Sequence, residues 1–125
     1  MKELKKVYKF GGASVKDAES VRNVGHILGR LKDERVFIVV SAMGKTTNAL
    51  EKLAEVSFNE SPPPIKDFEN IKAYHFDILS ALLPGDVDAA VQLESHFNRL
   101  WGRLQDNPVG NFNSHYDRIV SFGEY

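Results

Sequence analysis

Residues 36–48 read VFIVVSAMGKTTN, and this stretch decides how the chain around it folds. Its first five residues are apolar and mostly β-branched, which is typical of a strand buried on both faces of a parallel sheet. From Ser41 the residues become small and polar, so we expect the strand to end there in a loop. Thr46 or Thr47 can then cap a following helix, because a threonine oxygen accepts a hydrogen bond from a free helical N–H.

The end of this stretch partly matches a nucleotide-binding P-loop, since Gly44, Lys45 and Thr46 follow an apolar strand. A P-loop also needs a glycine at the position that Val39 occupies, where the backbone wraps around the phosphates. The sequence therefore argues against a P-loop. We expect Lys45 to be a solvated loop lysine.

The preceding residues complete a strand–helix–strand pattern. Residues 4–10 mix Val, Tyr and Phe with lysines and end at a glycine pair, which predicts a strand. Asp17 can serve as the N-cap of a helix. After it, apolar residues recur at three- and four-residue steps, and these are Ala18, Val21, Val24, Ile27, Leu28 and Leu31. A strand, a helix and a second strand in this order predict an α/β fold with a parallel sheet.

The second half of the chain is predicted to be helical. Residues 59–64 contain three prolines and should break the helix before them. Two helical patterns then span residues 65–105, with a turn at Pro84-Gly85. Their apolar positions are Ile65, Phe68, Ile71, Ile78, Leu79 and Leu82, followed by Val87, Val91, Phe97, Leu100, Trp101 and Leu104. Residues 107–111 form a loop, and residues 115–125 begin a further element.

Composition narrows the class of protein. A chain of 125 residues is long enough for one domain, and 42% hydrophobic residues can supply a core. The net charge of −1 favours neither nucleic acid nor a membrane surface as a partner. There are no cysteines, which excludes disulfides and thiolate catalysis. We expect a cytoplasmic protein, and because only two strands are predicted, we expect the N-terminal part of a larger one.

A better phosphate loop than the P-loop match lies in residues 8–15, YKFGGASV. Gly11 and Gly12 let backbone N–H groups approach an anion, and the helix start that follows adds partial positive charge. Lys9 can bring an ammonium group to a phosphoryl group, with the Ser14 hydroxyl nearby. The carboxyl ends of parallel strands lie at one edge of a sheet, so this loop and the loop after Ser41 should surround one anion.

Three short motifs resemble those of aspartate kinases, in the amino-acid kinase superfamily. KFGGASV, residues 9–15, is similar to the family's K-F-G-G-[TS]-S-V opening, with Ala13 in place of the commoner threonine. VVSAMGKTTNAL, residues 39–50, resembles the second loop of the family, and SFGE, residues 121–124, its later S-x-G-E motif. The resemblance implies a three-layer α/β/α fold with a parallel sheet (the carbamate-kinase-like, or amino-acid kinase, fold), truncated here, in which residues 65–105 are an added helical hairpin.

The resemblance also implies an activity, the transfer of the ATP γ-phosphate to the β-carboxylate of L-aspartate, giving 4-phospho-L-aspartate. This is the first step towards lysine, threonine and methionine. By the same resemblance, Lys9 is catalytic and contacts the phosphates. The other phosphate ligands would be Gly11, Gly12, Ser14 and Ser41, while Thr47 and Glu124 would bind aspartate. ATP and Mg²⁺ are the implied cofactors, with no metal ligands assigned in this chain.

Residues 1–125 would then be the N-terminal portion of the catalytic domain, without the ATP-binding half and the ACT regulatory domains. We expect this chain alone to be inactive and the full-length protein to be a homo-oligomer. Two alternatives stay open. One is another member of the superfamily, such as a glutamate-5-kinase or acetylglutamate kinase, although their opening motifs differ. The other is a non-catalytic interaction module built on the hairpin. His26, His75, His96 and His115 show no metal-ligand spacing.

Overall fold

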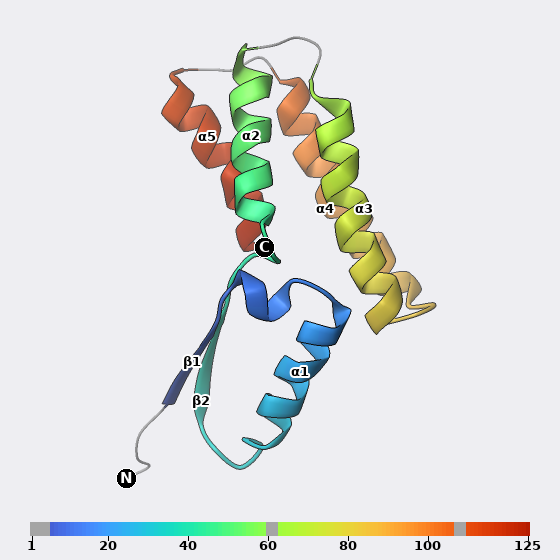
Figure 1. The fold of residues 1–125 in the computed structure, drawn as a ribbon. Helices are drawn as coiled ribbons and strands as arrows, with labels where there is room; N and C mark the ends of the chain where they lie inside the picture. Colours follow the sequence, from blue (N-terminus) through green and yellow to red (C-terminus); the bar gives the residue numbers. More distant parts are fainter. Residues whose placement is uncertain (1–5, 60–62, 107–109) are drawn as a thin grey trace. The chain divides into compact units, whose positions relative to one another are not determined.

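The computed structural model describes residues 6–59, 63–106 and 110–125. The chain divides into two compact units, Met1–Lys45 and Thr46–Tyr125. The first contains a small parallel sheet with one long helix, and the second is entirely helical among the residues described (Figure 1). The start of the first predicted strand and parts of the predicted breaks at 59–64 and 107–111 lie outside the described residues.

The first unit is the predicted strand–helix–strand arrangement. Its elements are β1 (Lys6–Phe10), the short 3-10 helix η1 (Gly12–Val15), α1 (Ala18–Gly29) and β2 (Val36–Val40). The two strands are parallel, in a register that pairs Lys6 with Val36 and Phe10 with Val40. Asp17 caps α1 as predicted, because its carboxylate accepts a hydrogen bond of 2.8 Å from the Ser20 N–H.

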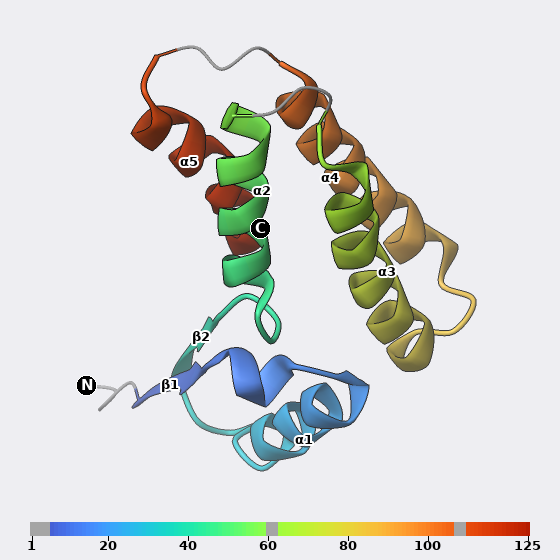
Figure 2. The same cartoon turned by 45° about the horizontal axis from the view of Figure 1, so that its top comes forward.

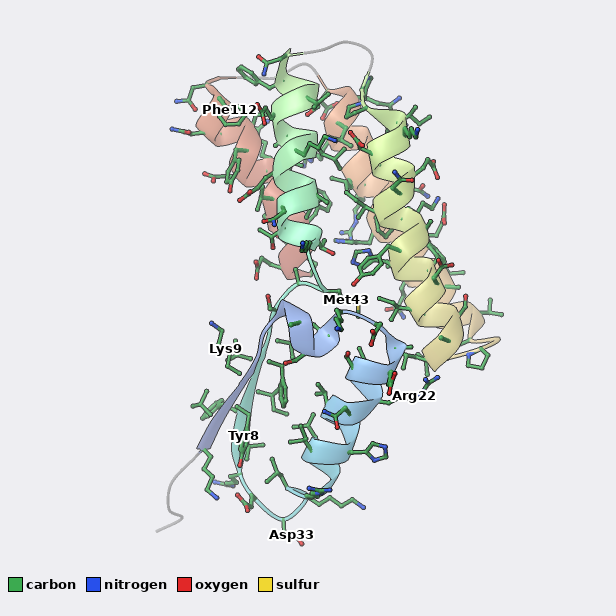
Figure 3. All side chains as sticks on the ribbon, viewed as in Figure 1. Tyr8, Lys9, Arg22, Asp33, Met43 and Phe112 are labelled. Carbon is green, nitrogen blue, oxygen red and sulfur yellow. The ribbon has the colours of Figure 1, made fainter. Side chains whose placement is uncertain are left out.

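One face of β1 packs against α1. Phe10, Val15 and Val24 form the buried centre of the contact, with Tyr8 and Leu28 packed around them. Successive residues of a strand point to opposite faces, so Lys9 lies on the other side. Figure 3 shows the Lys9 side chain directed away from α1.

The prediction that β2 is buried on both faces is wrong in this unit. Phe37 is 54% exposed, Val39 49% and Val40 54%. Ile38 and Val40 lie on the same side as Tyr8 and Phe10 and are exposed as well, because α1 packs on β1 and not on β2. An apolar run thus indicates a strand suited to burial on both faces, while the described part of the first unit covers neither face of β2.

The second unit begins with α2 (Thr46–Asn59), which is followed by a helical hairpin of α3 (Ile65–Leu82) and α4 (Val87–Gln105). The hairpin turn lies where Pro84-Gly85 predicts it, and Gly85 has a φ of +76°, a conformation that favours glycine. Figures 1 and 2 show α3 and α4 side by side. The unit ends with α5 (Phe112–Val120) and a single 3-10 turn, η2 (Ser121–Glu124).

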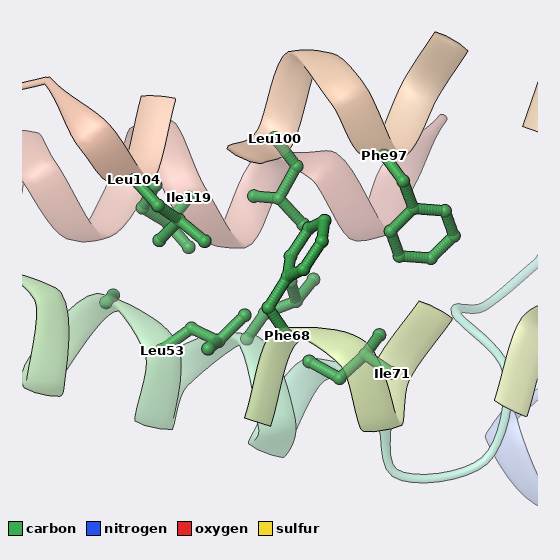
Figure 4. Close-up of a cluster of buried hydrophobic side chains, with 9 residues drawn as sticks. Leu53, Phe68, Ile71, Phe97, Leu100, Leu104 and Ile119 are labelled. Atoms are coloured by element: carbon green, nitrogen blue, oxygen red, sulfur yellow. The ribbon is translucent and has the colours of Figure 1, made fainter. Parts of the chain in front are cut away.

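The core of the second unit contains the apolar residues that the helical periodicity predicts. Figure 4 shows part of this cluster, which consists of Leu50, Leu53, Ala54, Phe68, Ile71, Phe97, Leu100, Leu104 and Ile119. Trp101 packs against it, with its ring 4.9 Å from that of Phe68. Val87 and Val91 belong to the same helical pattern, but they are 71% and 62% exposed. They lie in the first turns of α4, on a side that no described helix of the unit covers.

Polar contacts join α2 to α5. The buried His115 side chain, 5% exposed, lies with its Nε2 atom 2.7 Å from the Ser57 hydroxyl, which is also buried. The Tyr116 hydroxyl donates a hydrogen bond of 2.6 Å to the Glu51 carboxylate. Buried polar groups need such partners to offset their lost hydration, so these contacts help to fix how the two helices pack. Among the residues that the structure describes, no helix is both long and apolar enough to cross a membrane.

Candidate active site

The glycine pair of the first unit forms a bend directly after β1. Gly11 has extended backbone dihedrals, and its carbonyl accepts a hydrogen bond of 3.0 Å from the Ser14 N–H, which closes the first turn of η1. Gly11 and Ser14 are exposed, whereas Val15 is buried and anchors the turn. The bend therefore presents backbone and hydroxyl groups to solvent at the end of β1.

The loop after β2 is hydrogen-bonded to this bend. The Ser41 N–H donates to the Phe10 carbonyl at 2.9 Å, and the Gly44 N–H donates to the Gly12 carbonyl at 3.0 Å. The first bond continues the parallel pairing past the end of β2, and the second joins one loop to the other. The two strand-end loops of this unit therefore meet at the carboxyl edge of the sheet.

Their approach leaves no space for a side chain at residue 12. A Cβ atom on Gly12 would lie 2.5 Å from the Gly44 carbonyl oxygen and 3.2 Å from that of Ala42. Gly44 itself has a φ of +55°, which few residues other than glycine adopt easily. Glycine is required at residue 12 by close packing and at residue 44 by backbone conformation.

Lys9 lies in β1 just before the bend, and its side chain is exposed. Its register partner in β2 is Val39, so an apolar side chain lies beside the lysine stem. Among the described residues of the first unit, no carboxylate lies within ion-pair distance of the Lys9 ammonium group. Lys45, at the end of the second loop, is exposed as expected.

The two predicted substrate residues lie in the second unit. Thr47 is the second residue of α2, and its side chain is exposed. Glu124 is the last residue of η2 and is also exposed. The elements α2 and η2 are in contact, so both residues belong to one packed region. The convergence of Lys9 with Thr47 stays a prediction.

Sequence reasoning missed two histidines of the hairpin that contact these same elements. His75 of α3 places its Nδ1 atom 2.8 Å from the Ile71 carbonyl and its Nε2 atom 3.5 Å from the Thr46 hydroxyl at the start of α2. Burial lowers the pKa of His75 below its usual value, so it is neutral at pH 7. His96 of α4 places its Nε2 atom 3.0 Å from the Phe122 carbonyl in η2. Both histidines could have been identified in the sequence by their position beside the apolar residues of a helix face, where a polar side chain needs a partner.

No group of three or more His, Asp or Glu side chains suited to hold a metal ion occurs within residues 6–59, 63–106 and 110–125. The polar groups gathered at the sheet edge of the first unit are instead backbone amides and hydroxyls, which are ligands for anions.

A parallel strand pair whose carboxyl ends carry a glycine bend and a polar loop is typical of α/β proteins, the class in which ligands commonly bind at the carboxyl edge of the sheet. The chain belongs to the amino acid kinase family, because the family model matches residues 5–123. The resemblance seen in the three motifs is thereby confirmed at the level of the family.

Similar proteins in this family include aspartokinases. Aspartokinase 2, chloroplastic, of Arabidopsis thaliana is 54% identical over 54 residues, which are 43% of this chain and 10% of that protein. Bifunctional aspartokinase/homoserine dehydrogenase 2 of Escherichia coli (strain K12) is 28% identical over 122 residues, which are 96% of this chain and 15% of that protein. The chain thus spans only a small part of the length of these relatives.

Solved structures show the same relationship. E. coli aspartokinase III in complex with lysine and aspartate (T-state) matches with a TM-score of 0.80 and 26% identity, over 96% of this chain and 26% of that chain. The same enzyme in complex with aspartate and ADP (R-state) matches with a TM-score of 0.79 and 27% identity, over 97% of this chain and 26% of that chain. The predicted α/β amino-acid kinase fold is confirmed, and these residues form part of it.

Proposed function

We propose that this chain contributes the phosphoryl-transfer and aspartate-binding part of an aspartate kinase. The reaction transfers the γ-phosphoryl group of MgATP to the β-carboxylate of L-aspartate, giving 4-phospho-L-aspartate and ADP. The observation that carries the proposal is the hydrogen-bonded pair of loops formed by the KFGG and VSAMG segments at one sheet edge. Aspartokinase III, which shares this fold, has been solved with aspartate and ADP bound.

Phosphoryl transfer needs little covalent help from a protein, so catalysis consists mainly of positioning and of neutralising charge. In our proposal the Gly11 and Gly12 amides hold phosphoryl oxygens, and the Ser14 and Ser41 hydroxyls donate further hydrogen bonds. The Lys9 ammonium group neutralises the charge that develops as the bond to the leaving phosphate breaks. Magnesium enters with the nucleotide as MgATP.

The acceptor is recognised by residues of the second unit. Thr47 donates a hydrogen bond to a carboxylate of L-aspartate, and the start of α2 adds the partial positive charge of a helix N-terminus. Glu124 pairs with the ammonium group of the substrate. That pairing would reject a dicarboxylate without an amino group, because Glu124 would lose its partner.

The reaction is the first step of lysine, threonine and methionine biosynthesis, and we propose a homo-oligomeric, cytoplasmic enzyme at full length. Several plant relatives are named chloroplastic.

The solved aspartokinase III chains are much longer than this one, since the match covers 26% of their length. The 125-residue chain is therefore proposed to be inactive alone, because the ATP-binding half and the ACT domains would lie in the remainder.

The test is an ATP-dependent phosphorylation assay of the full-length enzyme with L-aspartate, L-glutamate and N-acetyl-L-glutamate as separate acceptors. We expect turnover with L-aspartate alone. Lys9→Ala should lower kcat by about a hundredfold or more, since such charge stabilisation is usually the largest catalytic contribution. Lys45→Ala removes the same charge from the neighbouring loop and should leave kcat within about twofold. Equal losses in both variants, or turnover with another acceptor, would contradict the proposal.

One observation favours the alternative of an interaction module. Leu83, Val87 and Val91 are exposed and follow one another at four-residue steps at the turn end of the hairpin. Sedimentation of the 125-residue chain and of its Val91→Glu variant tests this alternative. Self-association that the variant abolishes, in a protein without kinase activity at full length, would favour it over catalysis.

A further inference from the structure

The single turn η2, which carries Glu124, continues directly from α5, because Val120 and Ser121 keep helical dihedral angles. The last carbonyl groups at the end of a helix have no partner within it. Partners from other elements can therefore bind these carbonyl groups and help to hold η2 and Glu124 in place.

His96 of α4 makes such a contact. Its Nε2 atom lies 3.0 Å from the Phe122 carbonyl oxygen, which can only accept, so Nε2 carries the proton and donates. Its Nδ1 atom lies 3.4 Å from the Arg99 guanidinium, which can only donate, so Nδ1 accepts. The two partners together indicate that Nε2 donates and Nδ1 accepts, which is the arrangement that the Phe122 contact needs.

The His96 ring also packs against both aromatic neighbours of Glu124. Its centroid lies 5.2 Å from the Phe122 ring and 5.8 Å from the Tyr125 ring. The histidine thus contacts the residue two positions before the glutamate and the residue directly after it. His96 therefore contacts both aromatic residues that flank Gly123 and Glu124.

We infer that His96 is a positioning residue for Glu124 and so sets the affinity for the amino-acid acceptor. The inference rests on the proposed function, in which Glu124 pairs with the ammonium group of aspartate. It gives the hairpin a role in the site, because α4 supplies the group that holds η2 in place. His75 of α3 makes a comparable, longer contact with Thr46, next to the proposed substrate residue Thr47.

The experiment compares His96→Gln with His96→Asn in the full-length enzyme. The amide nitrogen of glutamine reaches the place of the histidine Nε2 atom, whereas that of asparagine reaches only the place of Nδ1. We therefore expect His96→Asn to raise the KM for L-aspartate about three- to tenfold, the effect of one lost hydrogen bond. The KM for ATP and kcat should stay within about twofold. His96→Gln should restore a KM near that of the unmodified enzyme.

Two further variants separate the possible outcomes. Glu124→Gln should raise the KM for L-aspartate at least as much as His96→Asn, and the exposed His26→Asn should change nothing. If Glu124→Gln raises this KM but both His96 variants leave it unchanged, the inference is overturned and the proposed function survives. Equal impairment by asparagine and glutamine would also overturn it, since the Nε2 donor would then be irrelevant. Absence of aspartate phosphorylation in the unmodified enzyme would overturn both.

Amide hydrogen exchange gives a readout that does not depend on activity. Loss of the His96 contact should speed exchange in residues 121–125 by about three- to tenfold, while α2 and α5 keep their protection. Unchanged exchange there in His96→Asn would show that η2 is held by other groups and would overturn the inference.

Discussion

Replacing Gly12 by alanine tests whether the two strand-end loops are packed as tightly as the structure shows. The added methyl group would lie 2.5 Å from the Gly44 carbonyl oxygen and 3.2 Å from the Ala42 carbonyl oxygen. Both neighbours are backbone atoms and cannot rotate away, so the loops must separate. Overpacking of this kind costs about 1–3 kcal/mol, and losing the hydrogen bond from Gly44 to Gly12 adds about 0.5–1.5 kcal/mol.

Alanine also offsets part of this cost, because it lowers the conformational entropy of the unfolded chain. This effect raises the free energy of unfolding by about 0.4–1 kcal/mol. We therefore expect Gly12→Ala to destabilise the first unit by about 1–3 kcal/mol. Gly11→Ala is the matched control, since no atom lies within 4 Å of the position that its methyl group would take and its φ of −74° suits alanine. That variant should be neutral or slightly stabilised.

The assay is urea unfolding of the 125-residue chain, followed by amide hydrogen exchange in β1 and β2. Trp101 is the single tryptophan of the chain and packs on the core of the second unit, so its fluorescence follows that unit separately. Gly12→Ala should weaken exchange protection in the strands more than it shifts the tryptophan transition. Equal stability of Gly12→Ala and Gly11→Ala would refute the close packing of the two loops.

Two other predictions concern the packing of α2 against α5. Burial holds the pKa of His115 below its ordinary value of 6.5, so the folded chain binds fewer protons there than the unfolded chain. The free energy of unfolding should therefore fall as the pH drops from 7.5 to 5.5, by at most about 1.4 kcal/mol per pH unit. Urea unfolding followed by Trp101 fluorescence measures this, and an equally steep pH dependence in His115→Gln would contradict it. Tyr116→Phe removes the hydrogen bond to Glu51 and should lower the free energy of unfolding in the same assay, whereas an unchanged value would show that the bond adds no net stability.

Local pattern predicted most of the helices and the ends of the strands. Periodic apolar residues predicted α3 and α4, Pro84-Gly85 predicted the turn between them, and Asp17 predicted the start of α1. Each of these signals acts over a few residues, through side-chain spacing, backbone conformation or capping. The helices and the turn could therefore be predicted from the sequence without knowing which elements pack together.

Contacts between residues that are far apart in the sequence could not be predicted from such local patterns. The sequence predicts that Gly12 lies in a bend, but the atoms that exclude a side chain there belong to residues some thirty positions later. The His96 contact with Phe122 joins α4 to η2, and no local pattern encodes it. The sequence also could not predict that Phe37 is exposed, because an apolar residue does not show which other elements pack against it.

The uncovered face of the first unit matters for anyone who produces this chain on its own. Phe37 and Val39 present apolar side chains beside Val7, on strands that each leave one edge without a partner among the described residues. Such edges can pair with those of other copies and lead to insoluble material at high concentration. Yield in soluble form should consequently improve with slow, dilute expression, or with a lysine placed at residue 37 or 39.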